Sequence, residues 1–440
     1  MTVADVRLWG RSIGAVSIEA GAEVAAFEFE PAFTASSIEI APLMMPLANR
    51  VYSFPALPRA AFHGLPGLLA DSLPDKFGNA LIDAWLAAQG RRPESFNAVE
   101  RLCYVGARGM GALEFVPTLG PRARTSTPLD VEALVKLATE VLANRTRVGG
   151  SFAEGRAHAA LEDILKVGTS AGGARAKAVI AWNPASNEVR SGQVRAPAGF
   201  GYWLLKFDGV HGNRDKELDD PAGYGAIEYA YSLMAGAAGV EMSECRLLEE
   251  GGRRHFMTRR FDRGPSGEKL HMQSLAALAH LDFNAAGAHG YEQAFAAIRR
   301  LGLPMAAAEQ QFRRMLFNVV ARNQDDHVKN IAFLMDKAGR WSLAPAFDVS
   351  FSYNPAGRWT ARHQMTVNGK QDGFEVADFR AVAELAGLKR GATEALLREV
   401  CDAVARWPEF AKAAGVAKDW QAHVARHLRL ELRAFAGPRR

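Results

Sequence analysis

The feature that most limits the fold of this chain is a change in its hydrophobic pattern at about Gly267. Before that point, short apolar stretches such as residues 176–182 and 201–209 are separated by glycine-rich turns, which is typical of a small antiparallel sheet. After it, apolar residues recur at the spacing of packed helices, and a single hairpin over residues 331–348 interrupts them. The pattern therefore predicts an α+β fold, with a strand-rich N-terminal region followed by a helical C-terminal lobe.

The length of 440 residues suggests two or three domains, at roughly 150 residues for each. The segment 118–130 is polar and contains two prolines, so it is the best candidate for a linker. We predict three domains, over residues 1–117, 128–264 and 265–440. Helices are expected at 76–88 and 129–143, and two or three half-buried strands are expected within the first 30 residues.

The composition is that of an ordinary soluble protein, with 48% hydrophobic and 23% charged residues. A net charge of +5 permits contact with an acidic partner such as nucleic acid, although the arginines are spread along the chain. Cys103, Cys245 and Cys401 have neither disulfide nor zinc spacing. No signal peptide and no run of 18 apolar residues is present. We therefore expect a cytoplasmic protein without a membrane partner.

The strongest local signal is the sequence NQDDHVKN, residues 323–330, between an apolar helix and a strand. Phosphoryl transfer needs a carboxylate that orients the attacking hydroxyl and an amide oxygen near the metal ion. Kinase catalytic loops place this Asp and Asn five positions apart. Asp325 and Asn330 have that spacing, whereas Asp326 does not. We predict Asp325 as the catalytic base or orienter and Asn330 as a magnesium ligand. Lys329 is predicted to neutralise charge on the transferred phosphoryl group.

Two further charged residues fit the same chemistry. Asp348 ends the second strand of the hairpin, where a second carboxylate would hold magnesium against the nucleotide phosphates. The usual D-F-G sequence is replaced by F-D-V. Lys206 ends an apolar strand, and its buried charge needs a partner or a phosphate. Glu228 is a candidate counter-charge for Lys206, and Glu217 is an alternative.

A glycine-rich stretch over residues 168–178 precedes Lys206. Glycines in such a turn let backbone amides approach phosphate oxygens. The stretch is not a Walker loop, because Ala174 follows Gly173 where that motif requires lysine, and it also lacks G-x-G-x-x-G. Each of these signals also has a purely structural explanation, as a turn or as a snorkelling lysine side chain. Their order along the chain, which is the order that a kinase requires, favours the functional interpretation.

Together these segments resemble the HipA family, the serine/threonine kinase toxins of bacterial type II toxin–antitoxin modules. The resemblance covers nearly the whole chain and implies a two-lobed, protein-kinase-like fold that uses ATP and Mg²⁺. Its N-terminal part is carried by VRLWGRSIGAV and FHGLPGLLADSLPDKFGNALI. Its catalytic part is carried by GTSAGGARAKA, WLLKF, TRRFDR, NQDDHVKN and LAPAFD.

The resemblance also implies roles for single residues. It gives Asp325 as catalytic, Asn330 and Asp348 as metal ligands, and Ser170 as a serine whose autophosphorylation is associated with inactivation. Thr169 is the adjacent alternative for that modification. Arg259 stands where some members carry glutamate, so an acidic contact to the nucleotide is in doubt. The implied ATP contacts are Ser170, Ala171, Gly172, Gly173, Ala174, Lys177, Lys206, Phe261, His327, Lys329, Asn330 and Asp348.

The family resemblance suggests partners as well. These are a protein substrate such as an aminoacyl-tRNA synthetase, a HipB-like helix-turn-helix antitoxin, and operator DNA bound through the antitoxin complex. Two alternatives stay open. A small-molecule phosphotransferase of kinase fold would share the D-x-x-x-x-N spacing, but usually with H-G before the aspartate, where this chain has N-Q. A kinase-like corepressor would act with the antitoxin and need no catalysis.

Overall fold

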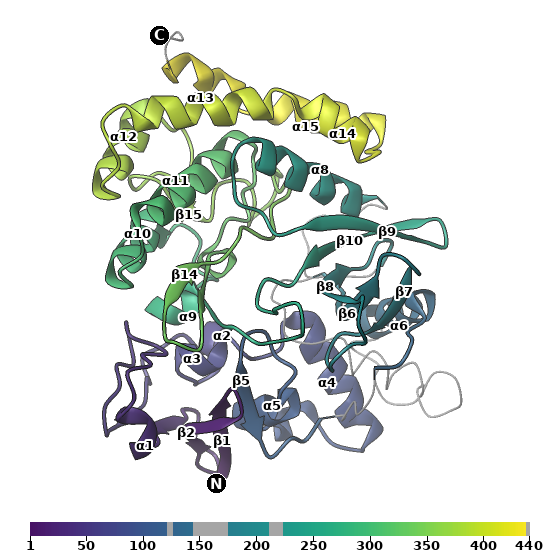
Figure 1. Cartoon of the computed structure of the whole chain (residues 1–440), viewed down its shortest axis with the longest axis vertical. Helices are drawn as coiled ribbons and strands as arrows, with labels where there is room; N and C mark the ends of the chain where they lie inside the picture. The colour runs from purple at the N-terminus through teal and green to yellow at the C-terminus, as the bar shows by residue number, and fades with distance from the viewer. Residues whose placement is uncertain (121–125, 144–174, 211–222, 437–440) are drawn as a thin grey trace. The chain divides into compact units, whose positions relative to one another are not determined.

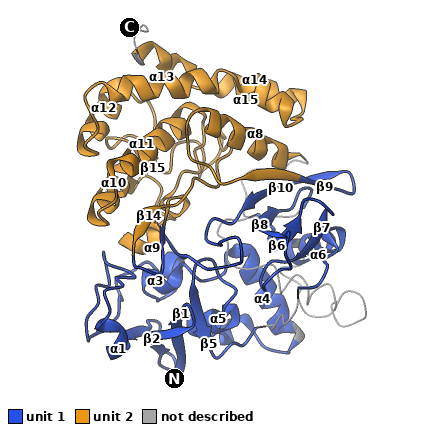
Figure 2. Cartoon of the chain, in the orientation of Figure 1, with its two compact units in different colours: residues 1–222, 248–273, 334–339 blue, residues 223–247, 274–333, 340–440 orange. Residues whose placement is uncertain are grey.

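The computed structural model describes residues 1–120, 126–143, 175–210 and 223–436 of the chain (Figure 1). The chain divides into two compact units, which are coloured separately in Figure 2. Unit 1 comprises Met1–Ala222, Leu248–Gln273 and Leu334–Gly339, and unit 2 comprises Gly223–Leu247, Ser274–Phe333 and Arg340–Arg440.

Unit 1 begins with an antiparallel sheet of five strands in the order β4-β3-β2-β1-β5. Alternate residues of its first three strands are buried, as expected for strands with one face against a core. The three strands within residues 1–30 confirm the expectation from sequence. The strands are β1 (Thr2–Leu8), β2 (Arg11–Ile18), β3 (Ala26–Phe29), β4 (Val51–Tyr52) and β5 (Leu113–Val116).

The longer helices of unit 1 start at residues whose side chains cap them. Asp75 accepts a hydrogen bond from the Gly78 amide at the start of α4, and Asn97 and Glu100 form a capping box at α5. The helices are α1 (Pro31–Thr34), α2 (Arg59–Phe62), α3 (Gly67–Ala70), α4 (Lys76–Ala88), the 3-10 turn η1 (Pro93–Ser95), α5 (Ala98–Val105) and α6 (Val131–Ala143).

A second five-stranded sheet has the order β7-β6-β8-β10-β9. One of its faces packs on α4 and α6 through a core that includes Phe77, Leu134, Ile180 and Trp203. The apolar stretches 176–182 and 201–209, which were expected to form strands, are confirmed as β6 and β8. Their bounds are β6 (Lys177–Asn183), β7 (Glu188–Ser191), β8 (Gly201–Lys206), β9 (Cys245–Glu250), β10 (Arg253–Arg259) and, further along the chain, β11 (His271–Ser274).

Part of the predicted linker is held in place. Leu129 donates its amide to Val189, and Ser191 donates its amide to Thr127, so residues 127–129 run beside β7. Asp130 then accepts from the Ala133 amide at the start of α6. The segment before that helix therefore belongs to the sheet rather than to an open linker.

Unit 2 is mainly helical. The long helix α11 packs against α13, and Trp407 of α14 packs edge-on against Tyr231 of α8 with ring centroids 5.4 Å apart. The helices are α8 (Tyr224–Ala237), α9 (Leu275–Ala279), α10 (Tyr291–Arg300), α11 (Met305–Val320), the turn η2 (Val328–Asn330), α12 (Val376–Leu385), α13 (Ala392–Val404), α14 (Trp407–Ala413), α15 (Lys418–His427) and the turn η3 (Leu430–Ala436).

A three-stranded sheet in the order β11-β13-β14 and a two-stranded sheet of β12 and β15 accompany these helices. The predicted hairpin is present as the neighbours β13 and β14, and β12 pairs in parallel with β15. The expected α+β class is thereby confirmed, with strands concentrated in the N-terminal region and helices in the C-terminal region. No helix of the described residues is long and apolar enough to cross a bilayer. The strands are β12 (His289–Gly290), β13 (Ala332–Met335), β14 (Trp341–Leu343) and β15 (Met365–Thr366).

Candidate active site

The predicted catalytic loop follows α11 in unit 2. The chain leaves the helix at Arg322, which has a left-handed backbone with φ of 56°. Asn323 then closes the loop onto the helix, because its side-chain amide donates to the Asn318 side-chain oxygen at 2.9 Å. These contacts fix where the two adjacent aspartates begin.

Asp326 is a buried anchor. Its side chain is 1% exposed and accepts hydrogen bonds from the Tyr291 hydroxyl at 2.7 Å, from His363 Nδ1 at 2.8 Å and from the Gln364 amide at 2.8 Å. Burial alone would raise the pKa of Asp326, but His363 and these hydrogen bonds outweigh it and hold the pKa below its usual value. With these contacts, the Asp326 carboxylate stabilises the fold and is not accessible to a substrate.

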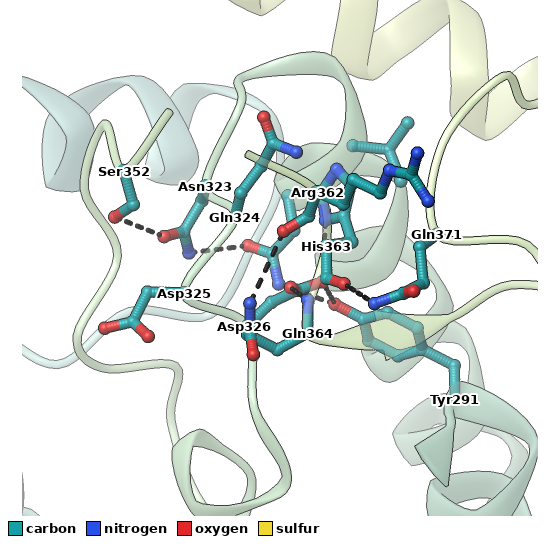
Figure 3. A network of polar contacts seen from close by, with 12 residues as sticks. Tyr291, Asn323, Gln324, Asp325, Asp326, Ser352, Arg362, His363, Gln364 and Gln371 are labelled. Carbon is teal, nitrogen blue, oxygen red and sulfur yellow. Dashed lines mark hydrogen bonds and ion pairs between the residues drawn. The ribbon is translucent and has the colours of Figure 1, made fainter. Parts of the chain in front are cut away.

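Asp325 has the opposite environment. Its side chain is 41% exposed, and Figure 3 shows its carboxylate directed away from the contacts around Asp326. The Trp359 indole donates to Asp325 Oδ1 at 2.7 Å, and His327 Nε2 lies 3.9 Å from the same oxygen. Of the two aspartates, Asp325 is thus the one that an acceptor hydroxyl could reach.

Asn330 is tied to Asp325 through the backbone. Its Nδ2 donates to the Asp325 carbonyl oxygen at 2.8 Å, and its own amide donates to the His327 carbonyl. A side-chain amide that donates through nitrogen presents its oxygen in another direction, and that oxygen can only accept. The geometry fits the expectation that the Asn330 oxygen binds a cation.

Asp348 adopts a left-handed backbone, with φ of 57°. A non-glycine residue in this region is uncommon and costs free energy, so it often marks a functional position. The neighbours Phe347 and Val349 line a small cavity together with His327 and Asn330. The segment that carries Asp348 therefore borders the catalytic loop. Carboxylate and amide oxygens are suitable magnesium ligands.

The predicted ATP lysine lies in unit 1. Lys206 is buried at the end of β8, with its Nζ 5.7 Å from the centre of the Phe256 ring. Its register partner on β6 is Lys177, and residues opposed in this way share a face of the sheet. Two buried lysines are therefore neighbours on one face of the sheet, and a carboxylate beside either of them offsets their repulsion.

Asp75 provides that carboxylate. Its Oδ2 lies 3.0 Å from Lys177 Nζ, and the two side chains are 5% and 4% exposed. Its other oxygen caps α4 through Gly78. Lys177, predicted only as an ATP contact, thus also joins the start of β6 to the start of α4. Its contact with ATP stays a prediction.

The TRRFDR segment forms a buried ion cluster within unit 1. Arg260 and Arg263 both contact the Asp262 carboxylate, at 2.7 and 2.8 Å, and Asp262 also accepts from the Gly111 amide. Burial would raise the pKa of Asp262, but the two arginines hold it far below its usual value. Phe261 lies between Arg260 and Asp262, so the cluster fixes the backbone on both sides of it. Its side chain is partly exposed.

Several predicted site residues lie outside the described residues, and several residues around the site were not predicted. Ser170, Ala171, Gly172, Gly173 and Ala174 lie outside, as do Thr169 and Glu217. Lys329 lies in the loop, with its Nζ 4.8 Å from the centre of the Phe283 ring. Arg259 is exposed, and Glu228 is buried on α8. Sequence reasoning missed Asp75, Tyr291, Trp359, His363 and the Asp262 cluster.

The helical unit of this α+β fold presents an accessible aspartate five residues before an asparagine, which is the spacing of a kinase catalytic loop. Comparison with known protein families identifies the family to which the chain belongs. The HipA N-terminal domain matches residues 4–116, and the HipA-like C-terminal domain matches residues 169–407. The chain belongs to the HipA family.

A solved HipA structure has the same fold. HipA of Shewanella oneidensis MR-1, from a toxin–antitoxin complex with HipB and operator DNA, is 18% identical with a TM-score of 0.66. The match covers 98% of this chain and 96% of that one. The Helicobacter pylori proinflammatory kinase CtkA is 11% identical with a TM-score of 0.33, over 54% of this chain and 90% of that one. No curated protein matches the sequence.

Proposed function

We propose that the chain is an ATP- and magnesium-dependent protein serine/threonine kinase that acts as the toxin of a toxin–antitoxin module. The observation that carries the proposal is the division of labour in the catalytic loop. Asp325 has the five-residue spacing to Asn330 and is accessible, whereas Asp326 is buried and fully engaged. This is the arrangement that orients an acceptor hydroxyl in phosphoryl transfer.

Asn330 and Asp348 would hold the magnesium ion. Two protein oxygens leave most of an octahedral shell to substrate phosphates and water, which is the usual situation for magnesium at nucleotide sites. The bound ion would neutralise negative charge on the phosphates. Within the chain, the hydrogen bond from Asn330 Nδ2 to Asp325 keeps the amide oxygen in one orientation.

ATP would be held by Lys206, by Lys177 and by the glycine-rich stretch 168–178, with Phe261 near the base. A lysine at the end of a buried strand can contact phosphate oxygens as a point charge. Within unit 1, the pairing of Lys177 with Asp75 offsets the repulsion between the two neighbouring lysines.

The proposed partners are a protein substrate such as an aminoacyl-tRNA synthetase, a HipB-like antitoxin, and operator DNA bound through that antitoxin. Membership of the HipA family supports the toxin–antitoxin setting. The Shewanella HipA structure contains HipB and operator DNA, and this chain's net charge of +5 is compatible with a nearby nucleic acid. A reducing cytoplasm suits three free cysteines.

The acceptor class can be tested directly. Protein incubated with radiolabelled ATP and magnesium is expected to label serine or threonine in other proteins, but not sugars, aminoglycosides or choline. Asp348→Ala is expected to abolish both this transfer and the magnesium dependence of ATP binding in calorimetry, because it removes a metal ligand.

Three results would contradict parts of this proposal. Label in small molecules alone would favour a small-molecule phosphotransferase. ATP binding without any transfer would favour a corepressor. Equal affinity of the unmodified protein for ATP with and without magnesium would show that Asn330 and Asp348 do not hold the ion.

We further propose that Ser170 is autophosphorylated and that this lowers activity. A phosphate there would add about −1.5 to −2 charges where ATP phosphates bind, so like charges would repel. Mass spectrometry after incubation with ATP and magnesium is expected to find one phosphate in the peptide 167–175, and none in Asp325→Asn. A phosphate on Thr169, or equal phosphate in that variant, would contradict autophosphorylation of Ser170.

A further inference from the structure

The segment that follows Asp348 returns to the catalytic loop. Its residues 359–364 contact both adjacent aspartates, although they lie more than thirty positions further along the chain. Trp359 donates from its indole to Asp325, while His363 and Gln364 donate to Asp326. This short stretch, the return arm, is therefore tied to the loop at both of its ends.

The Asp326 end of the return arm is an anchor. His363 Nε2 faces Arg429 at 3.1 Å, and because arginine can only donate, Nε2 accepts and Nδ1 donates to Asp326. The His363 carbonyl also accepts from Gln371 at 2.7 Å. His363 and Asp326 are each about 1% exposed, so these hydrogen bonds are shielded from water and difficult to exchange.

The anchor is linked to Trp359 within the arm. Gln364 donates its amide to Asp326 and its side-chain nitrogen to the Trp359 carbonyl oxygen. The backbone of Trp359 is thus held by a residue that is itself held by Asp326. The position of the indole depends on the buried aspartate, and the indole contacts the exposed one.

We propose that Trp359 is a positioning residue for Asp325, held in place by Asp326 through the return arm. The inference rests on the proposed kinase function. A half-exposed aspartate on a loop has several rotamers of similar energy, and the indole hydrogen bond selects one of them. Asp325 then orients the acceptor hydroxyl from a fixed direction.

Trp359→Phe tests this role, since it keeps a large ring and removes only the donor. We expect kcat to fall about 10- to 100-fold, as for loss of a hydrogen bond to a charged group. The KM for ATP should stay within about twofold, because the nucleotide contacts are unchanged. A fall in kcat at an unchanged KM for ATP distinguishes lost orientation of Asp325 from a general loss of structure, which would also raise that KM.

Trp420→Phe is the matched control. Trp420 lies on α15, where its ring packs edge-on near His423, with centroids 5.2 Å apart. It should leave kcat and the KM for ATP unchanged. A Trp359→Phe enzyme with the kcat of the unmodified protein would overturn the proposal. So would a lower kcat accompanied by a clearly raised KM for ATP, which would indicate a purely structural role.

Gln364→Leu keeps the question open to experiment if Trp359→Phe does not fold. The Gln364 side chain is buried, and its oxygen has no hydrogen-bond partner, so leucine should be tolerated. Losing the link to Trp359 is expected to lower kcat without changing the KM for ATP, and an unchanged kcat would overturn the tether. If Asp325→Asn is inactive while Trp359→Phe and Gln364→Leu are fully active, the role of Trp359 is rejected and the proposed kinase function stands. Activity in Asp325→Asn would instead reject the proposed catalytic residue.

Discussion

Replacement of Asp325 by asparagine is expected to leave the fold intact and to lower kcat by about 10²- to 10⁴-fold, the usual contribution of a positioned acid–base group. The side chain is half-exposed and keeps its size in this variant. Its oxygen can still accept from Trp359, so little stability should be lost. Transfer of labelled phosphate from ATP to protein measures the effect, and a thermal melt checks the fold.

Asp326→Asn is the control that separates the two aspartates. The buried carboxylate accepts hydrogen bonds from Tyr291, His363 and Gln364. In asparagine one of the two oxygens becomes an NH2 group, which would face these donors and leave at least one of them without an acceptor. We expect this variant to unfold at lower temperature. If Asp325→Asn keeps activity within about threefold of the unmodified protein, well short of a catalytic effect, Asp325 is not the catalytic residue and Asp326 should be tested next.

The elements around the site could be predicted because their signals are local. The helix expected at 76–88 is α4, and the strands expected at 176–182 and 201–209 are β6 and β8. In each case the hydrophobic pattern and a capping or turn residue agree. The choice of Asp325 over Asp326 also came from local spacing, and the difference in their burial now gives it a physical reason.

The contacts that support the loop could not be predicted in the same way. Trp359 and His363 meet the two aspartates across 34 and 37 positions of irregular chain. No periodicity extends over such a segment, because its path is set by individual hydrogen bonds rather than by a repeating pattern. A sequence supplies the residue types, but one sequence does not show which of several tryptophans returns to the loop.

Lys177 illustrates a different limit. A lysine next to a glycine-rich stretch was predicted to contact ATP, and the sequence offered no sign that Asp75 lies beside it. Asp75 belongs to the DSLPDKFG segment, where it could be understood as a helix cap. In the structure it performs both tasks, one with each carboxylate oxygen. The pair links the N-terminal helix α4 to the sheet that carries the predicted ATP lysine.

Lys177→Met should therefore destabilise unit 1 strongly, whatever its effect on the affinity for ATP. Removing one partner of a buried ion pair leaves the other charge without compensation, which costs about 3–5 kcal/mol. The urea midpoint for loss of structure should fall accordingly. Asp75→Asn tests the other side of the pair, and because asparagine also caps helices well, it removes the charge while keeping the cap on α4.

The double variant Asp75→Asn/Lys177→Met distinguishes pairing from nucleotide contact. With both charges gone, much of the lost stability should return, because no unpaired charge stays buried. ATP affinity should recover with stability if Lys177 serves the fold alone, and should stay low if Lys177 also binds phosphate. A Lys177→Met protein that unfolds at the same urea concentration as the unmodified one would show that the pair contributes nothing to stability. In that case the burial of Lys177 would have to be explained by its role at the nucleotide.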